Sequence, residues 1–101
     1  MYCVNDGAVM AAWAESQGVE GSMVTFLADT RSELTRALGV VLDHPGPMSV
    51  LGNPRSKRFA MYLDDGVIKV FNISEKPDDP AGDDFPESSC VDNMLAEIGA
   101  L

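Results

Sequence analysis

The sequence predicts an α/β protein in which a mixed sheet carries helices on both faces. In the first half of the chain, short apolar segments alternate with amphipathic segments of helical period. Two longer apolar runs follow, residues 59–63 and 67–73, and the Asp-Asp-Gly between them favours a tight hairpin turn. Both runs place apolar residues on both faces of the strand, which is typical of strands buried on two sides. An amphipathic helix ends the chain.

The first elements are the end of a strand and a helix. Residues 2–4 have the character of the last residues of a strand. Asn5 or Asp6 is the expected cap of a helix over residues 7–17, because either side chain can accept a hydrogen bond from a free backbone N–H. Gly18 is suited to close that helix in a left-handed conformation.

A short strand and a second helix come next. Residues 24–28 predict a buried strand. Thr30-Arg31-Ser32-Glu33 has the spacing of a capping box, in which the Thr hydroxyl and the Glu carboxylate bind free N–H groups reciprocally. The helix that follows is expected to stop at Gly39, and residues 40–42 predict another short strand.

A turn and a basic loop precede the hairpin. His44-Pro45-Gly46-Pro47 predicts a turn, and residues 48–51 lead into the loop. His44 could act as a general base or as a metal ligand. No second metal-ligating residue lies near it in the sequence, which favours a solvated loop histidine. Arg58 stands where the loop enters a strand, whereas Arg55 and Lys57 are expected to face solvent.

The segment over residues 75–87 is rich in acids and prolines. The EF-hand pattern fails there, because counting back from Gly82 puts Pro77 in the first ligand position. A solvated acidic loop is therefore favoured over a calcium site. Ser88 or Ser89 is the expected cap of the last helix, whose apolar face comprises Val91, Met94, Leu95 and Ile98.

Composition limits the classes of function. The chain has 101 residues, 46% of them hydrophobic, which suits one domain with an apolar core. Its formal net charge is −9, which disfavours nucleic acid and anionic membranes as partners. No apolar run has the length of a membrane span, and residues 1–6 lack the features of a secretory signal. We expect a reducing compartment, cytoplasmic or organellar.

The two cysteines, Cys3 and Cys90, lie far apart in the sequence and show no zinc spacing. Two reduced thiols are favoured over a structural disulfide, which stays an alternative. No metal or cofactor is expected.

Several segments together resemble one family. They are, in order, Val4-Asn5-Asp6, Met10 with Ala12-Trp13, Phe26-Leu27-Ala28-Asp29, Glu33-Leu34-Thr35, Leu38-Gly39-Val40, Gly52-Asn53-Pro54-Arg55-Ser56-Lys57-Arg58-Phe59 and Asp65-Gly66-Val67-Ile68-Lys69. This ordered set resembles the C-terminal part of the peroxiredoxins, most closely of the type II subfamily. Residues 1–101 would be the C-terminal portion of a single peroxiredoxin, or redoxin, domain.

The resemblance implies a partial thioredoxin-like fold without the N-terminal strands and the active-site helix. It implies a thiol peroxidase that reduces hydrogen peroxide and alkyl hydroperoxides, in antioxidant defence, with glutathione and glutaredoxin or thioredoxin as the donor. Family members commonly form homodimers. Arg58 matches the arginine that stabilises the reactive thiolate and the peroxide, and Met48, Val50 and Leu51 match a loop that borders the active site and a dimer contact.

The sequence also departs from the family pattern. Members carry their peroxidatic cysteine in a Pro-Gly-Ala-Phe-Thr-Pro-x-x-Cys-like segment, and no Thr-Pro occurs here. Cys3 falls where the family commonly has a serine, so it is not the expected nucleophile. Cys90 lies about two residues after the place of a resolving cysteine in some members. We therefore expect this chain alone to be inactive; the alternative is a non-catalytic partial subunit that pairs with a full-length peroxiredoxin.

Overall fold

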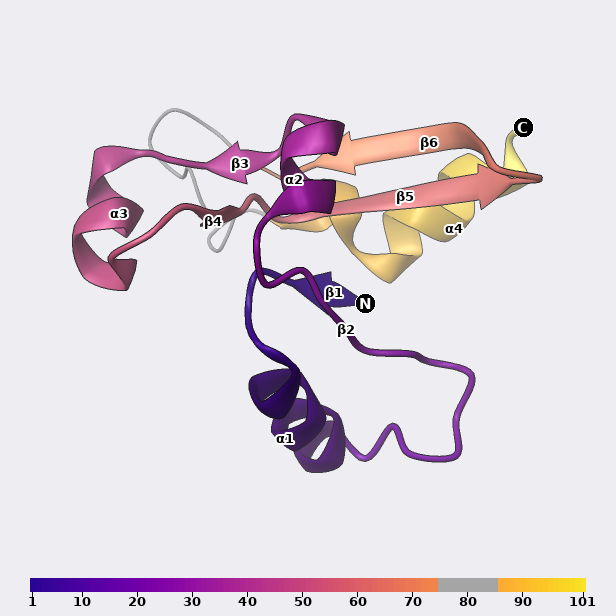
Figure 1. The fold of residues 1–101 in the computed structure, drawn as a ribbon. Helices are drawn as coiled ribbons and strands as arrows, with labels where there is room; N and C mark the ends of the chain where they lie inside the picture. The colour runs from indigo at the N-terminus through magenta and orange to yellow at the C-terminus, as the bar shows by residue number, and fades with distance from the viewer. Residues whose placement is uncertain (75–85) are drawn as a thin grey trace. The chain divides into compact units, whose positions relative to one another are not determined.

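The computed structural model describes residues 1–74 and 86–101, so the predicted acidic loop lies almost entirely outside the described residues. The elements in chain order are β1 (Tyr2–Cys3), α1 (Gly7–Gln17), β2 (Leu27–Ala28), α2 (Glu33–Leu38), β3 (Val41–Leu42), α3 (Pro45–Leu51), β4 (Arg55–Ser56), β5 (Phe59–Asp64), β6 (Val67–Ile73), the 3-10 turn η1 (Glu87–Ser89) and α4 (Val91–Gly99) (Figure 1). The predicted α/β class is confirmed. The chain divides into two units, residues 1–43 with 48–56, and residues 44–47 with 57–101.

The first unit holds two short ladders. β1 pairs in parallel with β2, and β3 pairs antiparallel with β4. Its buried apolar side chains are Val4, Met10, Val40 and Leu42. α1 has the predicted bounds and caps: the Asp6 carboxylate accepts a hydrogen bond from the Val9 N–H at 2.9 Å, and Gly18 closes the helix at φ 66°.

The predicted capping box of α2 is wrong. Ser32 is the N-cap residue, in a left-handed conformation at φ 57°, and its side chain makes no capping bond. The Thr30 hydroxyl donates instead to the carbonyl of Asn5 at 3.2 Å. The cap comes from Asp29, whose carboxylate accepts from the N–H of Leu34 at 3.3 Å and from the N–H and hydroxyl of Thr35 at 2.9 and 2.7 Å.

Replacing Asp29 with asparagine is expected to destabilise the chain in a pH-dependent way. Burial raises the pKa of this carboxyl, but hydrogen bonds from the Thr35 hydroxyl and from backbone N–H groups outweigh burial and hold the pKa below its usual 3.8. A carboxylate with a lowered folded-state pKa stabilises the fold above pH 3.8, and this contribution is lost as the pH falls through the folded-state value. Asparagine keeps an acceptor oxygen and loses only the charge, so Asp29→Asn should cost less than the ~1 kcal/mol of a lost helix cap at pH 7, and less still at pH 2.

Urea denaturation at the two pH values measures this difference. Asp43→Asn is the matched control, because Asp43 is exposed. An equal loss of stability at both pH values would contradict the assignment of Asp29 as a charged cap.

Residues 45–51 form a helix, α3, where the sequence predicts a turn followed by a connecting segment. Proline is common both in turns and at the first position of a helix. Its missing N–H costs nothing at the first position, because that N–H would have no partner within the helix. The prolines of this segment therefore do not distinguish a turn from the start of a helix. His44 precedes the helix, is exposed, and its Nδ1 accepts a hydrogen bond from the Gly46 N–H at 3.1 Å. This agrees with the solvated histidine that the sequence favours.

The predicted hairpin is present in the second unit. β5 and β6 pair antiparallel from Phe59 opposite Ile73 to Asp64 opposite Val67. The turn residues Asp65 and Gly66 have φ of 52° and 77°, as a tight hairpin turn requires. The register shifts between Tyr62 and Leu63, which places a bulge near the turn.

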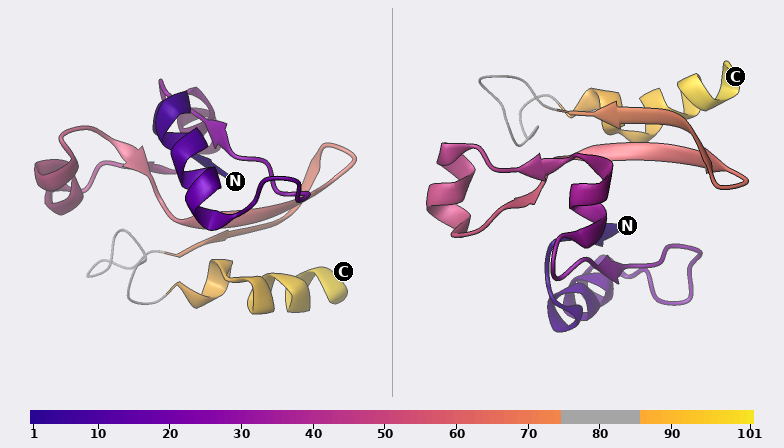
Figure 2. Two further views of the ribbon diagram at one scale, coloured as in Figure 1. Left: turned by 90° about the horizontal axis from the view of Figure 1, so that it is seen from below. Right: turned by 45° about the horizontal axis from the view of Figure 1, so that its top comes forward.

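The final helix packs on one face of this hairpin (Figures 1 and 2). The side-chain amide of Asn72, in β6, donates to Met94 Sδ at 3.4 Å and to a carboxylate oxygen of Glu97. Of the predicted apolar stripe, Met94 is buried and Ile98 is half-buried, but Val91 and Leu95 are 67% and 63% exposed, so that prediction holds only in part. The expected serine cap is wrong: Ser88 and Ser89 belong to η1, and Cys90 is the N-cap residue without a capping side-chain bond.

The hairpin strands are less buried than their sequence predicts. Every residue of β5 and β6 is half-buried or exposed. The register places Phe59, Met61, Leu63, Ile68, Phe71 and Ile73 on the face opposite Asn72. The rings of Phe59 and Phe71 stack on this face, with their centroids 5.3 Å apart.

Candidate functional site

Arg58 lies at the start of the hairpin, as predicted, and is exposed. It immediately precedes β5, and its carbonyl accepts a hydrogen bond from the Ser74 N–H at 2.9 Å. This bond extends the ladder of β5 and β6 by one residue beyond the pair of Phe59 and Ile73. The main chain of Arg58 is therefore fixed, while the residue is exposed.

Arg55 does not face solvent, so that prediction is wrong. It is half-buried, and its Nη1 donates to the carbonyl of Val4 at 2.5 Å and to Oδ1 of Asn5 at 2.8 Å. Its Nε is buried and has no hydrogen-bond partner among residues 1–74 and 86–101. The pairing of β4 with β3 sets which side chains of β4 turn inward, and that pairing has no signal in the local sequence.

The two cysteines are both free thiols, in agreement with the favoured prediction. Cys3 is half-buried in β1, and burial raises its pKa, although the nearby N-terminal ammonium acts in the opposite direction. A raised pKa lowers the thiolate fraction, and the thiolate is the nucleophile. Cys90 is exposed between η1 and α4, and its N–H donates to the carbonyl of Glu87 at 3.1 Å.

Three apolar residues of α3 were predicted to border a site. Met48 is half-buried, Leu51 is exposed, and Val50 is 83% exposed. The helix ends where the Gly52 N–H donates to the carbonyl of Met48 at 2.9 Å, with Gly52 at φ 79°. α3 therefore presents apolar side chains to solvent.

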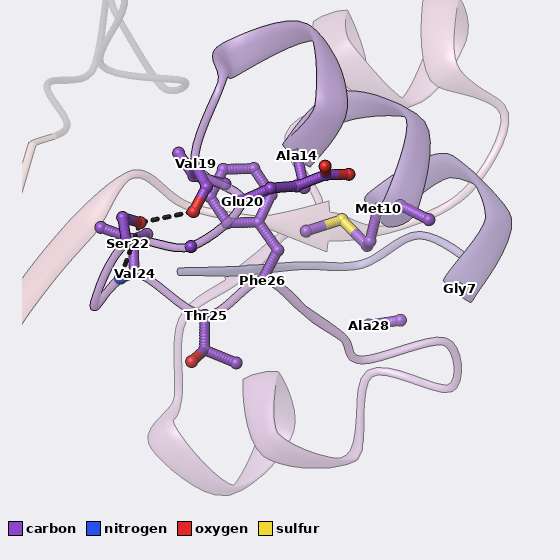
Figure 3. Close-up of a pocket in the computed structure, with 12 residues that line it drawn as sticks. Gly7, Met10, Ala14, Val19, Glu20, Ser22, Val24, Thr25, Phe26 and Ala28 are labelled. Carbon is purple, nitrogen blue, oxygen red and sulfur yellow. Dashed lines mark hydrogen bonds between the residues drawn. The ribbon is translucent and has the colours of Figure 1, made fainter.

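A pocket of about 380 Å³ lies in the first unit between α1 and residues 19–28 (Figure 3). Met10 and Phe26 lie in its wall (Figure 3), and Phe26 also packs against Trp13 with ring centroids 4.9 Å apart. None of the predicted site residues lines this pocket. The pocket is therefore not the site that the sequence predicts.

Within residues 1–74 and 86–101, no group of three or more His, Cys, Asp or Glu residues could hold a metal ion. Over the same residues, no helix is both long enough and apolar enough to cross a membrane.

Comparison with known proteins gives several relatives, although no protein-family model matches the chain. It is 50% identical over 93 residues to "Peroxiredoxin-2E-2, chloroplastic" from Oryza sativa subsp. japonica, a match that covers 92% of this chain and 38% of that protein. It is 41% identical over 93 residues to "Peroxiredoxin-2E, chloroplastic" from Arabidopsis thaliana, covering 92% and 36%.

A solved structure of a peroxiredoxin is also similar to this chain. The crystal structure of reduced Prx3 in complex with H2O2 from Vibrio vulnificus aligns with a TM-score of 0.75 at 37% identity, over 97% of this chain and 53% of that one. The chain spans about half, or less, of the length of the relatives that it matches.

Proposed function

Because the chain belongs with the type II peroxiredoxins and spans about half, or less, of their length, we propose that it forms the C-terminal part of a thiol peroxidase. In the proposed reaction, a thiolate from the family's Pro-Gly-Ala-Phe-Thr-Pro-x-x-Cys segment attacks one oxygen of hydrogen peroxide or an alkyl hydroperoxide. The O–O bond breaks, the sulfur becomes a sulfenic acid, and water or an alcohol leaves after taking up a proton. Glutathione with glutaredoxin, or thioredoxin, then reduces the sulfenic acid.

The position of Arg58 carries this proposal. A guanidinium favours the thiolate over the thiol by its charge, and its N–H donors bind the peroxide oxygens as negative charge develops on the leaving oxygen. Arg58 can serve both purposes because its side chain is exposed while the ladder bond from Ser74 holds its main chain. The relative crystallised with H2O2 supports peroxide as the substrate class.

Cys90 is a candidate resolving thiol in this proposal, since it is free and exposed and so accessible to a sulfenic acid. Resolution by glutathione or thioredoxin needs no second cysteine in the protein. We propose a reducing compartment for either route, and the two plant relatives named above are chloroplastic.

The purified chain, as written, is expected to consume hydrogen peroxide about as slowly as free cysteine. Neither thiol has the surroundings of a peroxidatic cysteine, and burial keeps Cys3 protonated. Joining the chain to the part of the rice relative that precedes the matched region should restore fast turnover. We call this fusion the joined protein. Stopped-flow measurement of peroxide consumption distinguishes the two outcomes.

Cysteine variants of the unextended chain complete the test. Rapid consumption by that chain, abolished by Cys90→Ser and kept in Cys3→Ser, would overturn the proposed division of roles. A slow joined protein with a correctly folded far-UV spectrum would also contradict the proposal.

The exposed apolar residues of α3 favour a second candidate, a non-catalytic subunit that pairs with a full-length peroxiredoxin. Val50 and Leu51 present apolar area to solvent, which is typical of a protein contact. Size-exclusion chromatography of the chain mixed with the full-length rice relative tests this. Co-elution that Val50→Asp prevents would support pairing through α3, whereas separate elution would remove the second candidate.

A further inference from the structure

Ser74 is a buried polar residue of the second unit that the proposed reaction does not use. It follows the last residue of β6 and is 2% exposed. Its hydroxyl lies 3.0 Å from the carbonyl oxygen of Pro86, 2.9 Å from the hydroxyl of Ser88 and 2.6 Å from that of Ser89. The hydroxyls of Ser88 and Ser89 also lie 3.4 Å from the carbonyl oxygen of Ile73 and 3.2 Å from that of Pro86, respectively. Each hydroxyl has one proton to donate, so the three hydroxyls share their protons in one network.

The backbone of the same residue holds Arg58. The Ser74 N–H donates to the Arg58 carbonyl at 2.9 Å, in the bond that extends the hairpin ladder. Ser74 therefore connects two regions: its N–H binds the residue before β5, and its hydroxyl binds the segment before α4. We call the three hydroxyl residues Ser74, Ser88 and Ser89 the serine cluster.

The segment that carries the cluster is itself fixed. The carbonyl of Ser88 accepts hydrogen bonds from the side-chain amides of Asn72 at 3.0 Å and Asn93 at 2.8 Å. Asn72 belongs to β6 and Asn93 to α4, so η1 is attached to both elements. A displacement of Ser74 would have to break several of these bonds together.

We propose that Ser74 is a positioning residue for Arg58. The serine cluster fixes the end of β6, and the ladder bond from the Ser74 N–H passes this constraint to the main chain of Arg58. The point from which the Arg58 side chain extends toward a thiolate and a peroxide is thereby fixed. A shift of the Arg58 main chain would displace the guanidinium by a similar amount, and a misplacement of about 1 Å can slow a reaction strongly. This inference rests on the role that the proposed function gives to Arg58.

The joined protein allows a direct test. Ser74→Ala removes the hydroxyl and leaves the N–H, so the folded protein should retain the hairpin while the cluster loses its central member. We expect the second-order rate constant for hydrogen peroxide to fall about fivefold, which corresponds to about 1 kcal/mol of transition-state free energy. Ser74→Thr keeps the hydroxyl and should retain most of the rate. Ser89→Ala is the milder variant if Ser74→Ala folds poorly, and it should reduce the rate in the same direction.

A double-mutant cycle separates positioning from a merely structural role. If Ser74 acts through Arg58, Ser74→Ala should have no further effect on the rate of an Arg58→Ala protein, because the group being positioned is absent. Ser16→Ala is the matched control, since the exposed Ser16 hydroxyl donates only within α1, to the Trp13 carbonyl at 3.0 Å. It should leave the rate unchanged.

Two results would overturn the inference: an unchanged rate in Ser74→Ala, or an equal fall in the presence and absence of Arg58. Failure of the proposed function is recognised separately, since Arg58→Ala itself would then leave the rate unchanged.

Discussion

Replacing Arg58 with alanine in the joined protein is expected to slow the reaction with hydrogen peroxide at least tenfold. Two effects are lost together. The thiolate loses a neighbouring positive charge, which raises its pKa, and the peroxide loses donors that bind its oxygens in the transition state. A tenfold fall corresponds to about 1.4 kcal/mol, which is less than the ~2.7–4 kcal/mol that the loss of one oxyanion donor costs, so tenfold is a lower bound.

Lys57→Ala is the matched control for this prediction. It removes a positive charge from the adjacent residue of the same basic loop, so a general loss of surface charge would affect both variants equally. Arg58→Lys keeps the charge but loses the planar fork of donors, and we expect an intermediate rate. The prediction fails if Arg58→Ala and Lys57→Ala give the same rate constant.

The isolated chain is expected to have low thermal stability and to self-associate. On the hairpin face opposite Asn72, Leu63 is 48% exposed and Ile68 is 44% exposed, and the strands pair only as two-stranded ladders over the described residues. Two-stranded ladders are marginally stable, and an exposed apolar face favours pairing with another chain. We expect a melting midpoint below about 60 °C, the upper range of ordinary mesophile domains, and oligomers at micromolar concentrations.

Light scattering during size-exclusion chromatography, together with thermal circular dichroism, measures both properties. Leu63→Thr keeps a residue that suits a strand and removes apolar surface, so it should reduce association. Leu34→Thr is a control, because Leu34 is an exposed apolar residue of the first unit and lies outside the hairpin. A monodisperse monomer that melts cooperatively above that temperature would contradict this expectation.

The sequence alone determined the features that depend on neighbouring residues. Asp6 and Gly18 bound α1 where they were predicted, and Asp65 with Gly66 forms the hairpin turn, because caps and tight turns need particular side chains or a positive φ within a few residues. The burial of Met94 follows from helical period in the same way, although Val91 and Leu95 of the same predicted stripe are exposed. The family was also recognisable from the sequence, since an ordered set of short motifs is specific even where each motif is not.

Only the tertiary structure decided the contacts between residues that are distant in the chain. Arg55 and Lys57 look equivalent in the sequence, yet the pairing of β4 with β3 directs Arg55 onto Val4 and Asn5, about fifty residues away. Ser74 likewise carries no local signal of its contacts with Arg58, Ser88 and Ser89. The physical reason is the same in both cases: a polar side chain can satisfy its hydrogen bonds with water or with any nearby partner, and strand pairing and helix packing decide which partner is near.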